Sequence, residues 1–394
     1  MTSIASQSLL QHLSLTQRIA ARLKELEMES QARCISSVPG VNLSSNDYLG
    51  LSQHPRLKEA LREGIETAGR MGSTGSRLLS GHHAIWDEVE EEFAAFAGTE
   101  AALCFSSGFA ANTGLLAALL GPEDVVFSDA LNHASIIDGI RLGRARKIIY
   151  PHGDLNRLED ELRRQTNIAG AKVIVTESLF SMDGDCAPLC ELFALARRYT
   201  AEIIVDEAHA TGTHGPNGRG LVAELGLQEQ VLAIVHTGGK ALASMGGFVC
   251  GSRLLRQFLI NRARSFIFST ALPPYMGYQL RAALRLAAGM DQERQHLASL
   301  STLLRERLHA LALCPGTKGS HIIPLIVGSN AEALRWAEAV AEQGFAVRAI
   351  RPPSVPRGTA RLRLSLTAAL TREDIKGFTR AVTAVAALKT PTQI

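Results

Sequence analysis

The sequence predicts an α/β fold: a large domain with a mainly parallel sheet flanked by helices, and a smaller α+β domain at the carboxyl end. Short apolar runs rich in isoleucine and valine alternate with stretches of helical periodicity through most of the chain. That alternation is typical of a parallel sheet with helices on both faces. With 394 residues, 46% of them hydrophobic, the chain is long enough for one large and one small domain.

The expected elements begin with an amino-terminal helix, because Ile19, Leu23 and Leu26 have helical spacing between about 15 and 29. A turn-rich link over 42–51 leads into the large domain. Buried strands follow, predicted at 101–105, 125–128, 147–150, 173–177, 203–206, 231–236 and 247–250.

The alternation stops at Pro273-Pro274, after which a helix over 275–288 leads to the smaller domain. That domain is expected to contain strands at 322–327, 346–350 and 361–365 and a helix at 330–343. We therefore expect an N-terminal helix and link (1–41), a large cofactor-binding domain (42–285) and a small C-terminal domain (286–394).

Composition argues against several kinds of partner. The 41 basic and 38 acidic residues are interspersed and give a net charge of only +3, so the basic stripe that nucleic-acid binding requires is not expected. The amino terminus does not resemble a signal peptide, and no apolar run is long enough to cross a bilayer. We expect a cytoplasmic protein without nucleic-acid or membrane partners.

The cysteines show no C-x-x-C spacing and are expected to be reduced thiols, mostly in the core, rather than zinc ligands or disulfides. No metal is therefore expected. The six stand at Cys34, Cys104, Cys186, Cys190, Cys250 and Cys314.

One acid and one lysine follow two of the predicted strands. Asp206 ends the run 203–206, and Lys240 comes shortly after the run 231–236 in Thr237-Gly238-Gly239-Lys240. The carboxyl ends of parallel strands open onto the ligand crevice of an α/β sheet, so both side chains are expected at one site. Pyridoxal 5'-phosphate (PLP) uses such a pair: a lysine holds it as a Schiff base, and a carboxylate keeps its ring nitrogen protonated. The pair therefore predicts PLP as cofactor.

An alternative interpretation of Asp206-Glu207-Ala208-His209 is the acidic box of a nucleic-acid helicase. That function also requires the phosphate-binding loop G-x-x-x-x-G-K-[ST]. Gly238-Gly239-Lys240-Ala241 lacks the first glycine and the hydroxyl of this loop. PLP chemistry is the better prediction.

A phosphate site is expected where Ser106–Asn112 follows the strand 101–105 and opens a helix, because free N–H groups and the positive helix end would face an anion there. A plain turn with a capping serine explains this segment equally well. Thr237 and Ser181 can add hydroxyl groups. His133 could stack on the pyridine ring and His209 could reach its phenolic oxygen, although either could also be a structural histidine.

Five stretches of the chain resemble motifs of the α-oxoamine synthase family, whose members have the aminotransferase-like PLP fold type I: Asn42–Leu51, Ser107–Asn112, Ser181–Asp185, Asp206–Gly212 and Ile350–Pro356. The resemblance extends from about Asn42 to the carboxyl terminus. The stretch from Arg351 to Arg363 is most similar to members that act in biotin synthesis.

This resemblance implies the condensation of L-alanine with a pimeloyl thioester, of coenzyme A or of a carrier protein, with loss of carbon dioxide. Sibling reactions remain alternatives, namely those of glycine C-acetyltransferase and 5-aminolevulinate synthase. A catalytically silent subunit is a third, which the intact Asp206, His209 and Lys240 argue against.

The resemblance also assigns roles. Lys240 is the Schiff-base lysine, Asp206 the partner of the ring nitrogen and His133 the stacking ring. The remaining cofactor contacts are Gly108, Phe109, Ser181, His209 and Thr237, together with Ser269 and Thr270, which are expected to reach the phosphate of the partner subunit in a homodimer with a shared active site.

Substrate contacts are implied for His133, Arg351, Ser354 and one amino-terminal arginine. Arg351 is expected to hold the carboxylate of alanine through a two-point contact. Ser354 stands where relatives often carry threonine, and its hydroxyl preserves the contact. The link before residue 42 looks shorter than is common, so the arginine for the distal pimeloyl carboxylate is harder to place; Arg33 fits best, and Arg22 is the alternative.

Overall fold

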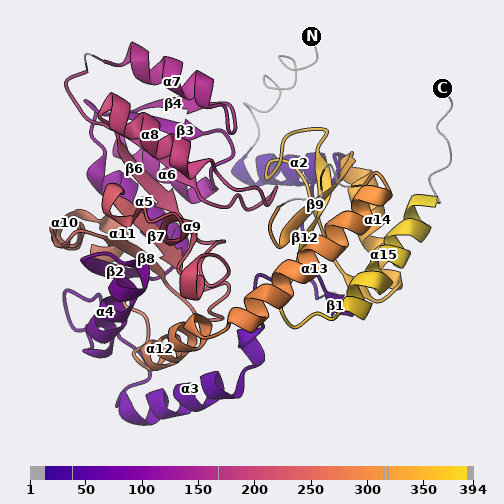
Figure 1. The fold of residues 1–394 in the computed structure, drawn as a ribbon, viewed down its shortest axis with the longest axis horizontal. Coiled ribbons are helices and arrows are strands. Elements are labelled where there is room, and N and C mark those ends of the chain that lie inside the picture. Colours follow the sequence, from indigo (N-terminus) through magenta and orange to yellow (C-terminus); the bar gives the residue numbers. More distant parts are fainter. Residues whose placement is uncertain (1–13, 38, 167, 314–315, 317–318, 388–394) are drawn as a thin grey trace.

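A seven-stranded sheet forms the centre of the larger part of the molecule (Figure 1). The computed structural model describes residues 14–387 except 38, 167, 314–315 and 317–318. The strands lie in the order β2-β8-β7-β6-β5-β3-β4, and only β8 runs antiparallel to its neighbours. Their bounds are β2 Ala101–Phe105, β3 Val125–Asp129, β4 Arg146–Tyr150, β5 Lys172–Glu177, β6 Glu202–Asp206, β7 Ala233–Thr237 and β8 Gly247–Gly251. The predicted α/β fold with a mainly parallel sheet is confirmed.

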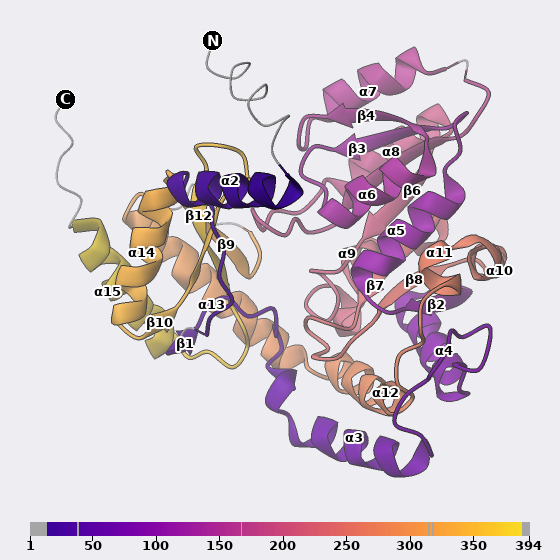
Figure 2. The same ribbon diagram turned by 180° about the vertical axis from the view of Figure 1, so that it is seen from behind.

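Helices cover both faces of this sheet because alternate residues of each strand point to opposite sides. On β5 and β6, Val173, Val175 and Ile204 pack into one apolar cluster, whereas Ile174 and Ile203 pack into another. The first cluster lies under α5, α6, α10 and α11, of which α5 and α6 lie side by side (Figure 2). The second lies under α4, α7 and α8. The bounds are α4 Ile85–Ala97, α5 Gly108–Leu119, α6 Ala134–Gly143, α7 Leu155–Arg164, α8 Leu189–Tyr199, α10 Arg253–Arg262 and α11 Arg264–Ile267.

The carboxyl-terminal part contains an antiparallel sheet in the order β11-β12-β9, flanked by α13, α14 and α15 (Figure 1). A short parallel pair, β1 with β10, joins the chain before the large domain to this part. The bounds are β1 Val41–Asn42, β9 Ile322–Gly328, β10 Phe345–Ala346, β11 Arg348–Ile350, β12 Ala360–Ser365, α13 Asp291–Ala310, α14 Asn330–Glu342 and α15 Arg372–Ala387. Shorter elements and connecting helices are α2 Leu15–Met28, α3 Pro55–Thr67, α9 Leu221–Glu224, α12 Tyr275–Ala288, η1 Leu51–Gln53, η2 Pro216–Gly218 and η3 Gln228–Gln230.

The expectation that the cysteines lie mostly in the core is wrong for three of them. Cys104 and Cys250 are buried on β2 and β8. Cys34, Cys186 and Cys190 are exposed, because the first two lie in connecting segments and the third is on the solvent face of α8. All five are free thiols, and Cys314 lies outside the described residues.

Candidate active site

The ends of β6 and β7 place an acid and an amine in one buried site. These strands are parallel neighbours, with Asp206 opposite Val235. Asp206 is the last residue of β6, and Lys240 follows β7 in the glycine turn. Asp206 is 6% exposed. The strand order therefore produces the meeting that was expected from the sequence.

Two donors orient the carboxylate of Asp206. Its Oδ2 accepts a hydrogen bond of 2.6 Å from the side-chain amide of Asn112, and its Oδ1 accepts one of 2.8 Å from the N–H of Ala208. Asn112, in turn, donates to the hydroxyl of Ser135 at 3.0 Å. Asn112 belongs to the Ser107–Asn112 motif, but its role as a carboxylate donor was not predicted.

A chain of buried polar groups leads away from Lys240. Its Nζ lies 2.8 Å from His209 Nε2, and His209 Nδ1 lies 2.6 Å from the hydroxyl of Tyr48. Burial lowers the pKa of Lys240 to about 8, although Asp206 acts in the opposite direction. Burial, and then Lys240, also lowers the pKa of His209 well below its ordinary value, so this imidazole is neutral near pH 7.

Glu177 is a second acid at this site that the sequence analysis did not consider. It ends β5 in register with Asp206 and is buried. Burial, followed by the charge of Asp206, raises the pKa of Glu177 to about 8. A signal was present in the sequence, since Glu177 ends its predicted strand in the same way that Asp206 ends the next.

The amino terminus of α5 brings Gly108 close to Thr237. A Cβ atom at Gly108 would lie 3.5 Å from Thr237 Oγ1. Ser107 caps the helix by accepting from the N–H of Ala110 at 3.1 Å, whereas the N–H groups of Gly108 and Phe109 lie in the first turn, where a helix has no internal acceptors. These donors and the Thr237 hydroxyl form a site suited to a phosphate.

His133, Ser181 and Ser354 line one cleft with a volume of about 430 Å³. His133 is at the amino terminus of α6, where its Nδ1 accepts from the N–H of Ser135 at 3.3 Å. Burial lowers the pKa of His133, so its ring is neutral. The cleft lies between the strand ends of the large sheet and the segment that follows β11.

Arg351 contacts the amino-terminal link. Its guanidinium donates to the carbonyl oxygens of Ser30 at 2.6 Å and Ala32 at 3.2 Å. Burial, and then the neighbouring charge of Arg33, lowers the pKa of Arg351. Arg33 itself is exposed, and Arg22 is an exposed residue of α2 paired with Glu25 at 2.7 Å. The structure thus places Arg33 and Arg351 together and Arg22 on a helix surface.

Arg363 is a buried cation near Lys240 that was not predicted. It is 7% exposed and donates to the carbonyl of Ser181 at 2.5 Å and to Asn46 Oδ1 at 3.2 Å. Its charge contributes to lowering the pKa of both Lys240 and His209. The alternation of arginine and leucine over 361–364 was the available signal, because it places two arginines on one face of a strand.

Ser269 and Thr270 follow α11 and line a small cavity with Arg77 and Ser106. Ser269 and Thr270 therefore lie next to the turn between β2 and α5 and next to the loop before α4.

The residues of the site fit PLP. A buried amine of lowered pKa suits its aldehyde, an oriented carboxylate suits its ring nitrogen, and a helix amino terminus with a threonine hydroxyl suits its phosphate. His133 and His209 are neutral aromatic groups next to these.

Comparisons with known proteins agree with this geometry. A family model described as aminotransferase class I and II matches residues 38–382. The 8-amino-7-oxononanoate synthase of Geobacter sulfurreducens is 44% identical over 387 residues, covering 94% of this chain and 98% of that protein. The protein of the same name from Aromatoleum aromaticum is 46% identical over 338 residues, covering 86% and 87%. The chain belongs to the class I and II aminotransferases, in the 8-amino-7-oxononanoate synthase family.

Solved structures of this family and of its relatives superpose on the chain. Serine palmitoyltransferase from S. paucimobilis with a bound PLP–myriocin aldimine has a TM-score of 0.87 at 30% identity, covering 95% of this chain and all of that one (100%). An 8-amino-7-oxononanoate synthase from Francisella tularensis has a TM-score of 0.77 at 30% identity, covering 88% and 98%. The chain is a PLP-dependent enzyme of fold type I.

Proposed function

We propose that this protein condenses L-alanine with a pimeloyl thioester to give 8-amino-7-oxononanoate, carbon dioxide and a free thiol, as a step of biotin biosynthesis. The observation that carries the proposal is the contact of Lys240 with His209 beside Asp206, in a chain whose relatives of about the same length are 8-amino-7-oxononanoate synthases. The protein is expected to act in the cytoplasm.

When bound, PLP withdraws electrons from the α-carbon of the amino acid. Asp206, fixed by Asn112 and Ala208, would pair with the ring nitrogen. His133 supplies a ring for stacking. The phosphate is assigned to the first turn of α5 at Gly108 and Phe109 and to Thr237. Ser181 is a further contact of the cofactor, and His209 is assigned to its phenolic oxygen.

Lys240 is the proposed base. An amine removes a proton only in its neutral form, and an ordinary lysine is almost fully charged near pH 7. Burial lowers the pKa of Lys240 to about 8, so part of the amine is neutral near pH 7 and can accept a proton. Lys240 would then accept the α-proton of alanine, and the resulting carbon nucleophile would attack the thioester carbonyl and expel the thiol. The β-keto acid so formed would lose its carboxyl group as carbon dioxide to give 8-amino-7-oxononanoate.

Two arginines and a serine are proposed to bind the substrates, with a third arginine as an alternative for one of them. Arg351 holds the carboxylate of alanine and Arg33 the distal carboxylate of the pimeloyl chain. Ser354 contributes a hydroxyl to the cleft that it shares with His133. Arg363 is a second candidate for the alanine carboxylate, because it is buried and electrostatically coupled to Lys240, whereas Arg351 donates to the link.

A homodimer completes the site in this proposal, with Ser269 and Thr270 of one subunit at the phosphate of the other. Two large apolar side chains are exposed nearby. Phe268, which directly precedes the segment, is 72% exposed, and Leu79, in the loop before α4 that hydrogen-bonds to the segment, is 82% exposed. An isologous contact would bury the same patch on both subunits.

A sibling acyl transfer is the second candidate function, favoured by the serine palmitoyltransferase superposition. Thiol release should be measured with alanine, glycine or serine against thioesters of graded length, each on coenzyme A and on carrier protein. We expect turnover to be greatest with alanine and the pimeloyl chain. Greater turnover with glycine and a short acyl chain, or with serine and a long one, would replace the proposal by the sibling reaction.

A further inference from the structure

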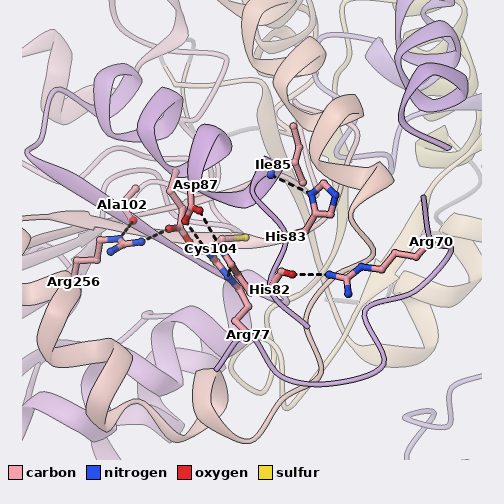
Figure 3. Close-up of polar contacts among 10 residues, drawn as sticks. Arg70, Arg77, His82, His83, Ile85, Asp87, Ala102, Cys104 and Arg256 are labelled. Carbon is pink, nitrogen blue, oxygen red and sulfur yellow. Dashed lines mark hydrogen bonds and ion pairs between the residues drawn. The ribbon is translucent and has the colours of Figure 1, made fainter. Parts of the chain in front are cut away.

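A buried carboxylate on α4 contacts β2, α10 and the loop that precedes α4. Glu90 of α4 is 3% exposed. Its Oε1 accepts from the N–H of Cys104 at 2.9 Å and forms an ion pair with Arg77, and its Oε2 accepts from Arg256 Nη2 at 2.7 Å. Figure 3 shows Arg77 and Arg256 approaching the region of Cys104 from two sides. We call Arg77, Glu90 and Arg256 the Glu90 cluster.

Arg77 belongs to the loop between α3 and α4, residues 68–84, so the cluster fixes that loop to the large sheet. A second arginine closes the loop upon itself: Arg70 donates to the carbonyl oxygens of Ser80 at 3.0 Å and His82 at 2.6 Å. Figure 3 shows the contact of Arg70 with His82. The loop conformation is therefore set by two guanidinium groups, each with a fixed geometry of donors.

The 68–84 loop in turn holds the segment that contains Ser269 and Thr270. The N–H of Ala271 donates to the carbonyl of Gly75 at 2.9 Å, and the hydroxyl of Ser73 donates to the carbonyl of Leu272 at 2.7 Å. Arg77, Ser269 and Thr270 also line one cavity. These two hydrogen bonds connect the loop of Arg77 to the segment that carries Ser269 and Thr270.

Both the loop and the segment carry exposed apolar side chains. Met71 is 63% exposed, Leu78 48%, Leu79 82% and Phe268 72%. Side chains of this size are usually covered, so this surface suits contact with a second copy of the chain.

We propose that the Glu90 cluster is a positioning device that acts across the dimer. By fixing the 68–84 loop it places Ser269 and Thr270 for the phosphate of PLP bound to the partner subunit. This inference rests on the proposed function and its homodimer. Arg77 and Glu90 are positioning residues, since neither is assigned a contact with the cofactor.

The first test is cofactor affinity. Arg77→Gln should raise the dissociation constant of PLP, measured by titration of the cofactor-free dimer, by roughly tenfold or more, the usual effect of removing a residue that orients a binding group. Arg77→Lys keeps the charge but loses the planar fork of donors, so its dissociation constant for PLP should lie between those of the wild type and Arg77→Gln. The matched control is Arg281→Gln, which breaks ion pairs with Glu88 and Glu92, two α4 residues that do not contact Arg77, and should leave the affinity unchanged.

The second test asks which subunit Arg77 serves. Dimers of one Arg77→Gln chain and one Lys240→Ala chain, isolated with two different tags, contain one site with both its own Lys240 and an intact neighbouring segment. We expect them to match dimers of one wild-type and one Lys240→Ala chain in turnover and in PLP affinity at that site. A dimer in which one chain carries both substitutions and the other is wild type should instead remain impaired.

An Arg77→Gln defect that persists in the first mixed dimer and is absent from the second would show that Arg77 serves its own subunit, and would overturn the inference. An unchanged PLP affinity in the Arg77→Gln homodimer would overturn it as well. If that variant does not fold, Arg77→Lys and Arg70→Gln take its place in the same pairings. Wild-type protein that binds no PLP, or sediments as a monomer, would instead contradict the proposed function on which the inference rests.

Discussion

Lys240 is an amine whose charge is set by its burial and by the acids around it. In cofactor-free protein its pKa should lie near 8 rather than at the ordinary 10.5. Asp206 raises this pKa, so Asp206→Asn should lower it further. Competitive amine labelling at a series of pH values, read by mass spectrometry, gives both midpoints. A wild-type midpoint near 10, or an upward shift in the variant, would contradict this description of the site.

Asp206 is expected to contribute charge more than shape. Asp206→Asn preserves the size of the side chain and removes its charge, so the cofactor should still bind. Turnover with alanine should decrease by at least about 100-fold, the scale of an electrostatic catalytic group. Steady-state rates and cofactor content of the same preparations check this. Unchanged turnover would refute the assigned role.

Substitutions of the different arginines should affect the binding of different substrates. Arg33→Ala should leave the KM for alanine unchanged and reduce the preference for a pimeloyl over an uncharged heptanoyl thioester. Loss of a charged hydrogen bond, worth roughly 1.5–3 kcal/mol, should raise the KM for alanine in either Arg351→Lys or Arg363→Lys. The variant that shows this increase identifies the residue that binds the carboxylate. Arg22→Ala is the control, because Arg22 is exposed and paired with Glu25.

Full preference for the pimeloyl chain in Arg33→Ala, combined with its loss in Arg22→Ala, would reverse the assignment of the two amino-terminal arginines. An unchanged KM in both lysine variants would remove Arg351 and Arg363 together.

The meeting of Asp206 and Lys240 could be predicted because it depends only on strand order and on the common direction of parallel strands. Contacts between distant segments could not be predicted in this way. Tyr48 reaches His209 from the turn-rich link over 42–51, and Arg363 reaches Ser181 from β12. Neither contact follows from local periodicity or spacing. The same limit applies to Arg351, whose guanidinium contacts the amino-terminal link.

Among the elements, the strands of the large sheet were predicted within one or two residues, since buried parallel strands are continuous runs of branched side chains. The single strand predicted at 346–350 is wrong, because β10 and β11 are separate strands in different sheets. The helix at 275–288 was also confirmed. The pair β1 and β10 was not predicted, because each strand has only two residues and its partner lies about 300 positions away in the chain. Helices α13 and α15 were not assigned either, although they cover the small sheet.

One histidine joins the elements that carry the cleft. His152, after β4, lies 2.9 Å from Asp129 at the end of β3 and 2.8 Å from Asp185 in the loop that carries Ser181. These contacts, with Asp129 the larger cause, raise the pKa of His152 from 6.5 to about 10. A group whose pKa is raised on folding stabilises the folded state fully below its unfolded pKa, and this stabilisation is lost as the pH rises through the folded pKa.

His152→Gln should therefore lower the midpoint of thermal unfolding most at pH values below about 6.5, and the difference from wild type should disappear by about pH 10. Thermal unfolding of both proteins across this range checks the expectation. A difference that does not change with pH would mean that His152 contributes packing rather than charge.

On the scale of the whole molecule, the cleft that contains His133, Ser181 and Ser354 is formed by both the large sheet and the segment after β11. The domain boundaries at 41/42 and 285/286 remain predictions, and the second falls within α12. In the part of the chain that the structure describes, no helix is both long and apolar enough to cross a membrane.

The fate of the alanine carboxyl group tests the central claim most directly. The protein should be supplied with PLP, a pimeloyl thioester and L-alanine labelled with carbon-13 in its carboxyl group. We predict one labelled carbon dioxide and one free thiol for each 8-amino-7-oxononanoate formed, and none of the three with Lys240→Ala. Thiol release that leaves the labelled carbon in the product, or that continues without Lys240, would contradict the account.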